Sequence, residues 1–182
     1  TVGKHENKMG HRASNTAEIF FDDVKVPAEN ILRREGFGFI IAMKTLDYAR
    51  PSVGAGGIGV ARAAYEEALK YSQNRVQFGK PIASFQYNSF KLADMATEID
   101  AARLLVYRSA WMLDNKLKAS KESAMAKIVA TDTAMKVTVD AVQLFGGYGY
   151  MKEYPVEKMM RDAKITQIYE GTNQIQRIVI AS

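Results

Sequence analysis

One short segment near the carboxyl end combines residue types that could carry out acid–base chemistry. Glu170 stands immediately before Gly171, and Thr172 and Asn173 are residues that commonly begin a helix. The free N–H groups of a helix N-terminus favour anions and can hold phosphate. A carboxylate in an apolar cleft has a raised proton affinity and can act as a general base. An ordinary loop glutamate would have the same local sequence, so both interpretations stay open at this point.

A second pair of charged residues, Asp47 and Arg50, is spaced by about one helical turn. A guanidinium beside a carboxylate can serve as a fork for anionic or polar groups of a ligand. The same spacing is also typical of an exposed ion pair that contributes little to stability. Nothing in the neighbouring sequence decides between the two interpretations.

Residues 54–59, Gly-Ala-Gly-Gly-Ile-Gly, match the G-x-G-x-x-G pattern of dinucleotide-binding loops. That pattern indicates a nucleotide site only between a strand and a helix, with an acidic residue about 20 residues further on. Here Arg50-Pro51 precedes the glycines, and the loop-like residues 78–81 follow where a second strand would be needed. We interpret these glycines as small residues that let two helices approach closely.

Several classes of chemistry find no support in the composition. The 182 residues include no cysteine, which excludes thiolate chemistry, disulfides and cysteine-type zinc sites. His5 and His11 lie in a polar stretch without paired ligands, so we expect no metal site. No serine–histidine–aspartate pattern appears in a motif context, so hydrolytic catalysis is not expected.

The charge balance favours a small anionic ligand over a nucleic acid or a membrane. Lys and Arg total 25 against 20 Asp and Glu, which gives a net charge of +5. No basic run exceeds the pair Arg33-Arg34, and no aromatic–basic pattern typical of RNA binding is present. The longest uncharged runs, residues 51–61 and 141–151, are too short to span a bilayer.

Apolar residues recur at helical spacing through most of the chain. The expected helices cover residues 39–71 (where Pro51 either falls in a first turn or kinks a longer helix), 92–113, 122–145, 156–168, and the end of the chain from Thr172 or Asn173; residues 74–83, 115–120 and 147–155 are expected to connect them. Two apolar stripes are predicted: Leu92, Met95, Ala96, Ile99, Ala102, Val106, Ala110 and Leu113, and then Ala124, Ile128, Met135, Val139 and Val142. Long helices with short connections predict a mostly α protein, an antiparallel up-and-down bundle of the four-helix type.

The first part of the chain has a different pattern. Residues 18–26 are rich in β-branched and aromatic residues and end at Pro27, which predicts a strand. A strand pair is not stable alone, so this short β segment needs a sheet that the rest of the chain does not supply. The chain also begins with Thr1 instead of Met, and we therefore expect it to be an excised fragment.

An ordered series of stretches resembles one known family. They are Phe21–Pro27 (FDDVKVP), Arg75–Pro81 (RVQFGKP), Gln143–Gly147 (QLFGG) with Gly149, Tyr154-Pro155, Met160–Ala163 (MRDA), and Ile168–Thr172 (IYEGT) with Gln174–Arg177 (QIQR). On these residues the chain is identified as a member of the acyl-CoA dehydrogenases, of the short- to medium-chain type that includes butyryl-CoA dehydrogenase. The stretches cover nearly the whole chain, and the ordered set is highly specific.

The resemblance implies two domains and one reaction. Residues 1–32 would be the tail of a middle β-domain, and residues 33–182 the C-terminal helical bundle. The family oxidises the α,β bond of fatty acyl-CoA thioesters with bound FAD. Glu170 matches the catalytic base, which removes the α-proton while the β-carbon passes hydride to N5 of the flavin. Preorganised donors, among them the backbone N–H of this glutamate, stabilise the developing enolate.

Further site residues are implied by their match to family positions. For FAD these are Arg75, Gln77 and Phe78, which would reach across a subunit interface, and Gln143, Gly146, Gly147, Thr172 and Gln174. For the acyl-CoA substrate they are Asp47, Arg50 and Gly171. Some relatives place the base near the position of Ala49, which has no ionisable group, so Glu170 is favoured. No metal is implied.

The family also implies partners and a setting. We expect a homo-oligomer, a tetramer built around the bundle, with an electron-transferring flavoprotein as electron acceptor. The compartment would be the cytoplasm of a bacterium or the mitochondrial matrix of a eukaryote. We expect this chain alone to have little or no dehydrogenase activity, because the upstream flavin contacts are absent from it. The alternatives are an acyl-CoA oxidase-like flavoenzyme and a helical assembly module without catalysis.

Overall fold

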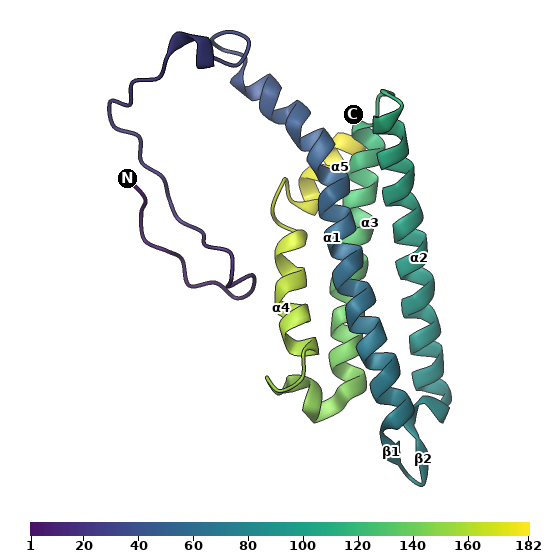
Figure 1. Ribbon diagram of the computed structural model, residues 1–182. Helices are drawn as coiled ribbons and strands as arrows, with labels where there is room; N and C mark the ends of the chain where they lie inside the picture. Colours follow the sequence, from purple (N-terminus) through teal and green to yellow (C-terminus); the bar gives the residue numbers. More distant parts are fainter.

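The computed structural model describes residues 1–182, and five α-helices form most of it. They are α1 (Gly38–Asn74), α2 (Gln86–Asp114), α3 (Ser120–Phe145), α4 (Val156–Thr166) and α5 (Asn173–Ala181). Figure 1 shows that α1, α2, α3 and α4 run alternately down and up, which confirms the expected antiparallel bundle. No helix combines the length and the hydropathy needed to cross a bilayer.

The first helix, α1, continues through Pro51, so the proline lies inside one longer helix and not in the first turn of a new one. Proline removes one backbone donor, and its ring kinks a helix that continues through it. Figure 1 shows α1 bent in its N-terminal half. Asp47, Arg50 and the glycine-rich residues 54–59 therefore belong to one helix of 37 residues.

The connection expected at residues 74–83 is a tight β-hairpin. Strand β1 (Val76–Gln77) pairs antiparallel with β2 (Lys80–Pro81), and Phe78 and Gly79 between them have φ values of 52° and 78°. Two residues with positive φ are typical of a type I′ turn, which matches the twist of the flanking strands. The turn leaves the Phe78 ring 92% exposed at the hairpin tip.

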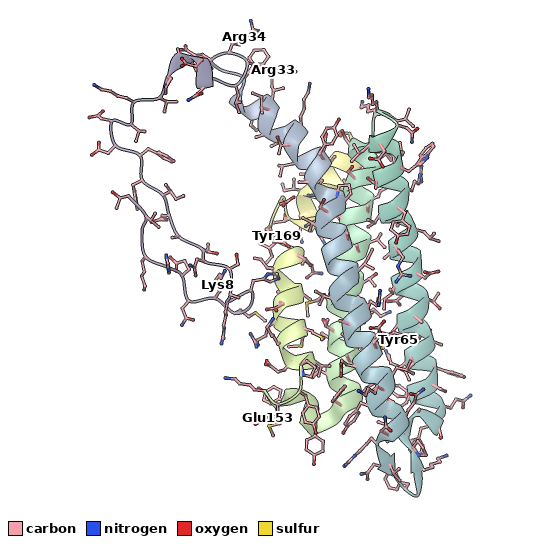
Figure 2. The ribbon with its side chains drawn as sticks, in the orientation of Figure 1. Lys8, Arg33, Arg34, Tyr65, Glu153 and Tyr169 are labelled. Atoms are coloured by element: carbon pink, nitrogen blue, oxygen red, sulfur yellow. The ribbon has the colours of Figure 1, made fainter.

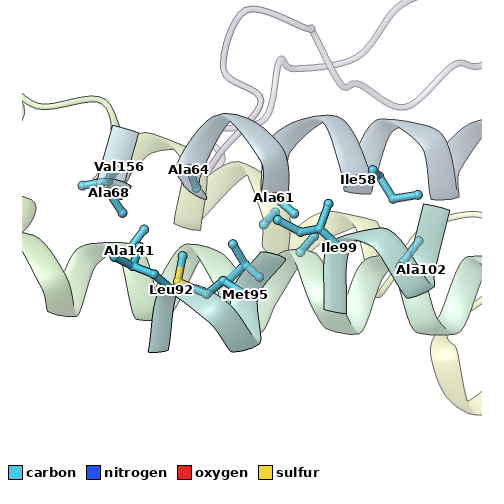
Figure 3. Packing of buried hydrophobic residues seen from close by; sticks show 14 of the residues in the cluster. Ile58, Ala61, Ala64, Ala68, Leu92, Met95, Ile99, Ala102, Ala141 and Val156 are labelled. Carbon is cyan, nitrogen blue, oxygen red and sulfur yellow. The ribbon is translucent and has the colours of Figure 1, made fainter. Parts of the chain in front are cut away.

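The core is built around α3, which packs against each of the other four α-helices. The stripe predicted on α2 is confirmed at Leu92, Met95, Ile99, Ala102 and Val106, which are all buried, whereas Ala96, Ala110 and Leu113 are only partly buried. Figure 3 shows members of this stripe beside small residues of α1, namely Ala61, Ala64 and Ala68.

The stripe predicted on α3 is wrong. Only Ala124 of that set is buried, whereas Val139 is 45% exposed and the other three are partly buried. Small residues face the neighbouring helices instead: Ala126, Ala130, Ala134, Thr138 and Ala141. A helix surrounded on several sides buries small side chains where backbones come close, so the largest apolar residues do not mark its core face.

The glycines of residues 54–59 lie inside α1, and their interpretation as packing residues is confirmed. A Cβ at Gly54 would come within 2.9 Å of α2, and one at Gly57 within 3.2 Å of α3. Gly56 and Gly59 have nothing within 4 Å of the corresponding position. The pattern thus contains two glycines that closely packed helices require and two that face outward.

Residues 1–37 form a long loop outside the bundle and join it at the start of α1 (Figure 1). The strand predicted over residues 18–26 is reduced to a single bridge between Ile19 and Val2, because no neighbouring strand extends the pairing. The apolar side chains of this segment are therefore exposed: Phe20, Phe21, Val24, Val26, Ile31 and Leu32 are 46–80% exposed.

The long loop contacts the bundle at residues 9–11. Arg161 of α4 donates from Nη1 to the carbonyl oxygen of Met9 at 2.8 Å, and the N–H of His11 donates to Asp162 Oδ1 at 2.7 Å. In Figure 2 the labelled Lys8 lies on the side of α4, whereas Arg33 and Arg34 lie at the far end of the loop. This contact fixes one point of the loop near the turn that follows α4.

Candidate active site

The turn between α4 and α5 carries Glu170 in an uncommon backbone conformation. Glu170 and Gly171 have φ values of 53° and 89°. A left-handed conformation is ordinary for glycine but rare for glutamate, and such residues cluster at functional sites. Thr172 then caps α5, as its sequence predicts, with Oγ1 accepting from the N–H of Ile175 at 3.3 Å. Glu170 is thereby held beside the N-terminus of a helix.

The two carbonyl groups of this turn face buried side chains. Gln176 Nε2 donates to the carbonyl oxygens of Glu170 and Gly171, at 3.2 and 2.9 Å, and Lys127 Nζ donates to that of Gly171 at 3.0 Å. The backbone N–H groups of Glu170, Gly171 and Thr172 donate to no other group of the chain. Because C=O and N–H point in opposite directions across a trans peptide, the inward carbonyls turn the N–H groups of Gly171 and Thr172 outward.

One carboxylate oxygen of Glu170 is left free for chemistry. Oε2 is buried and has no hydrogen-bond partner. Buried polar atoms without a partner are few in folded proteins, because each one costs free energy. A proton can reach Oε2 without the loss of an existing hydrogen bond. This is the arrangement that a general base requires.

Below the turn lies a buried polar cluster that the sequence patterns did not reveal. Lys127 of α3 is fully buried, and its ammonium also donates to Asn173 Oδ1 at 2.8 Å. Asn173 Nδ2 donates in turn to Thr131 Oγ1 at 3.0 Å and to Asp132 Oδ1 at 2.7 Å. The available signal was a lone lysine in the otherwise apolar residues 124–130, because lysine is rarely buried unless it is paired.

Burial lowers the pKa of Lys127 from 10.5 to about 8. Desolvation is the largest cause and the cation of Arg50 acts in the same direction, whereas the carboxylates of Asp132 and Glu170 raise the pKa. At neutral pH most of the side chain is still protonated, so a positive charge lies under the turn that carries Glu170. Burial and the neighbouring Glu170 carboxylate also raise the pKa of the Tyr169 hydroxyl.

Asp47 and Arg50 form a largely buried unit and not an exposed ion pair. Arg50 Nη1 donates to Asp47 Oδ1 at 2.5 Å, and Ser120 Oγ donates to Asp47 Oδ2 at 2.6 Å. Arg50 is 3% exposed, and its Nε has no hydrogen-bond partner. The electrostatic effect of Arg50 on Lys127 places this unit beside the cluster under Glu170.

Five of the eight residues predicted to bind the cofactor line one cavity of about 550 Å³ at the hairpin end of the bundle. They are Arg75, Gln77, Gln143, Gly146 and Gly147. Aromatic rings complete the lining: Tyr71 and Phe145 stack with centroids 4.0 Å apart, and the Arg75 guanidinium lies 5.5 Å from the Tyr148 ring. A cation, side-chain amides, glycine backbone and aromatic rings together suit a phosphate-bearing aromatic ligand.

The other three predicted cofactor residues lie elsewhere. Phe78 is exposed at the hairpin tip, and Thr172 and Gln174 belong to the turn and to the first residues of α5 beside Glu170. The turn contacts α3 at Thr131, and Gln143 of the cavity follows on the same helix about 18 Å further along its axis. One copy of the chain therefore presents two separate groups of predicted cofactor residues.

Comparisons with known proteins agree on one family. The model of the acyl-CoA dehydrogenase C-terminal domain matches residues 36–182. The acyl-CoA dehydrogenase of Bacillus subtilis (strain 168) is 55% identical over 181 residues, which is 100% of this chain and 48% of that protein. A subunit of the caffeyl-CoA reductase-Etf complex of Acetobacterium woodii is 51% identical, with the same coverage of 100% and 48%. The structure of butyryl-CoA dehydrogenase from Megasphaera elsdenii matches with a TM-score of 0.98 and 57% identity, covering 100% of this chain and 47% of that one.

The chain thus spans about half the length of the curated relatives it matches. The matched residues 36–182 include all five α-helices, the turn with Glu170 and the cavity lined by Arg75. The chain therefore belongs to the acyl-CoA dehydrogenase family, and its helical bundle is the C-terminal domain of that family.

Proposed function

We propose that this chain carries the catalytic base of an FAD-dependent acyl-CoA dehydrogenase, and that Glu170 is this base. One observation carries the proposal: Glu170 Oε2 is buried without a hydrogen-bond partner, on a turn whose backbone N–H groups have no acceptor within the chain. Removal of a proton from carbon needs a free base and also donors for the oxygen that gains charge. The turn supplies both.

The proposed reaction forms a double bond between two neighbouring carbons of an acyl-CoA thioester. The Glu170 carboxylate takes the α-proton, and the electron pair of that C–H bond becomes the second bond between the α- and β-carbons. The β-hydrogen leaves with its electron pair to FAD, which supplies hydride-accepting chemistry when bound. The N–H of Glu170 would donate to the thioester oxygen and stabilise its developing negative charge.

The two groups of cofactor residues would serve different parts of FAD. Around Arg75 the cavity offers a cation and glycine backbone for phosphates, and aromatic rings and amides for a nucleotide. Thr172 and Gln174 stand beside Glu170, where the hydride acceptor is needed. Because about 18 Å of α3 separates the two groups, we propose that the cavity of one copy holds an FAD that reacts beside Glu170 of another copy.

Asp47, Arg50 and Gly171 are the proposed contacts to acyl-CoA. Arg50 keeps an unpartnered donor at Nε next to the cluster that underlies Glu170. Gly171 follows the base directly, and a side chain there would come within 2.7 Å of Gln176 Nε2. The absence of a Cβ therefore leaves room for the buried Gln176 amide that holds the turn from beneath.

We further propose a homotetramer with an electron-transferring flavoprotein as acceptor. Five large apolar side chains on α2 are 60–70% exposed: Tyr87, Phe90, Leu104, Tyr107 and Trp111. A helix surface of this kind favours association. The Acetobacterium woodii relative belongs to a complex with Etf. The exposed apolar side chains of residues 18–32 favour a boundary near residue 32, between a β-domain tail (1–32) and the bundle (33–182).

The substitution Glu170→Gln tests the role of the base, because it keeps the shape of the side chain and removes its basic oxygen. In the purified full-length enzyme the variant should retain its flavin absorbance, while butyryl-CoA bleaches that absorbance about 10³-fold more slowly than in the wild type. Glu153→Gln is the matched control, since Glu153 is exposed and forms no ion pair. Bleaching at the wild-type rate in Glu170→Gln would remove Glu170 from this role, and a series of acyl-CoAs of graded length would define the preferred substrate.

A further inference from the structure

We propose that Lys127 is a positioning residue for this reaction: from α3 it holds the Glu170–Gly171 turn in its reactive shape and places a positive charge beneath it. The inference rests on the proposed role of Glu170. Lys127 stands 44 positions before Gly171 in the chain, so only the packing of the bundle brings the two residues together.

The ammonium group of Lys127 joins two parts of the turn. It donates to the carbonyl oxygen of Gly171 at 3.0 Å and to Asn173 Oδ1, in the first residue of α5, at 2.8 Å. Gln176 Nε2 shares the Gly171 carbonyl and also holds that of Glu170. Lys127 and Gln176 are both fully buried, so solvent does not compete for these hydrogen bonds.

A charged donor does more at this position than a neutral one. A hydrogen bond from an ammonium polarises the Gly171 carbonyl, and through the same peptide group it strengthens the outward N–H of Thr172 as a donor. Keeping Lys127 charged in this buried position costs stability. A contact with a structural role only would not need the charge.

The charged groups around Lys127 come from each element packed against it. They are Asp47 and Arg50 from α1, Asp132 from α3, Glu170 from the turn, and Arg177 from α5, whose Nη2 lies 3.7 Å from Asp132 Oδ2. With Lys127 protonated, three cations balance three carboxylates. Without Lys127 the same surroundings hold three carboxylates and only two cations.

The test compares Lys127→Met with the matched control Thr131→Val in the purified full-length enzyme. Thr131 lies one turn further along α3, is equally buried, and contacts Asn173 without a charge and without touching Gly171. For each variant we would measure the thermal midpoint, flavin absorbance, kcat and KM for butyryl-CoA, and hydrogen–deuterium exchange of residues 168–174.

Lys127→Met should keep its flavin and lower kcat by about 100-fold with KM changed by less than about threefold, because the base is misplaced while binding remains. The amides of the turn should exchange faster, because its carbonyl groups lose a charged donor. Thr131→Val should keep kcat within about twofold of the wild type.

A Lys127→Met protein with wild-type kcat and wild-type amide exchange in the turn would overturn the proposal. So would a fall in kcat shared equally by both variants in proportion to their loss of thermal stability, because that result would mean a structural role only. If Lys127→Met does not fold, Lys127→Gln, which is neutral but polar, has to show the fall in kcat at an almost unchanged KM. Full turnover in Glu170→Gln would instead refute the role of Glu170 itself, and the two failures are thus distinguishable.

Discussion

Lys127 Nζ and the carbonyl oxygen of Gly171 lie 3.0 Å apart, and this contact links the central helix of the bundle to the turn that carries Glu170. Because α3 packs against every other α-helix, its position is fixed by the whole core. The peptide that follows Glu170 therefore takes its orientation from the bundle and not from the turn alone. The geometry of the proposed base is a consequence of helix packing.

The buried charge of Lys127 should make stability depend on pH in a specific window. Its pKa is lowered from 10.5 to about 8 in the folded protein, so between these values the unfolded chain binds more protons than the folded one. Stability contributed by this group must then rise with pH across that window. From pH 7 to 9.5 the expected gain in unfolding free energy is about 2 kcal/mol.

The measurement is denaturant unfolding at several pH values for the wild type and for Lys127→Met. Only the wild type should show the rise, and the difference between the two proteins isolates this one group. Raised pKa values of Tyr71 and Tyr169 act in the opposite direction, but only above pH 10, which is why the series stops at 9.5. Parallel curves for the two proteins would contradict a buried charged lysine.

Arg75 should contribute to flavin affinity more than other cations of the same hairpin. It lines the cavity with Gln143 and Gly147, and charge-assisted hydrogen bonds to phosphate are about twice as strong as neutral ones. Arg75→Gln should therefore weaken FAD binding at least about 10-fold, as measured by titration of the flavin-free protein. Lys80→Gln is the control, because Lys80 lies on β2 outside the cavity lining, with its ammonium 4.6 Å from the Phe85 ring. Equal affinities in the two variants would remove Arg75 from the cofactor site.

Helices could be predicted from the sequence because apolar spacing reports which face of a helix is buried. This worked for α2, where one side packs and the other is exposed, and it failed for α3, which has neighbours on several sides and buries alanine and threonine. The prediction of a strand at residues 18–26 was wrong for a different reason. A strand needs a partner, and the chain supplies only the bridge to Val2.

Part of the candidate site could likewise be predicted from local sequence, and part of it could not. Glu170 was found because a glycine and a helix-capping threonine follow it, which are local signals, and because the family resemblance covers that segment. Lys127 was missed because its meaning depends on a contact with Gly171 that no local pattern encodes. Arg50 was singled out by its spacing from Asp47, but its burial and its bond to Asp47 follow from the packing of α1.

Gly171 and Gly36 form a matched pair that separates backbone strain from steric conflict. Both have positive φ, 89° and 81°, but a Cβ would come within 2.7 Å of Gln176 Nε2 only at Gly171. Gly36→Ala should cost about 1 kcal/mol of unfolding free energy and leave kcat unchanged. Gly171→Ala should cost about 2–3 kcal/mol, because displacement of Gln176 also breaks its bonds to the turn, and kcat should fall with it. Equal stability losses and unchanged turnover would show that Gln176 does not hold the turn.

The glycines of α1 provide the last test, because Gly54 and Gly56 both lie inside the helix but have different surroundings. A Cβ at Gly54 would lie 2.9 Å from Val106 Cγ2, whereas none of the surrounding atoms lies within 4 Å of one at Gly56. Alanine is favoured over glycine in a helix by about 1 kcal/mol, so Gly56→Ala should raise the thermal midpoint. Gly54→Ala should lower it despite the same gain, since overpacking a dense core costs about 1–3 kcal/mol. A rise in both variants would mean that α1 and α2 are not packed as closely as the structure shows, and the interpretation of the motif as a helix-packing device would fail.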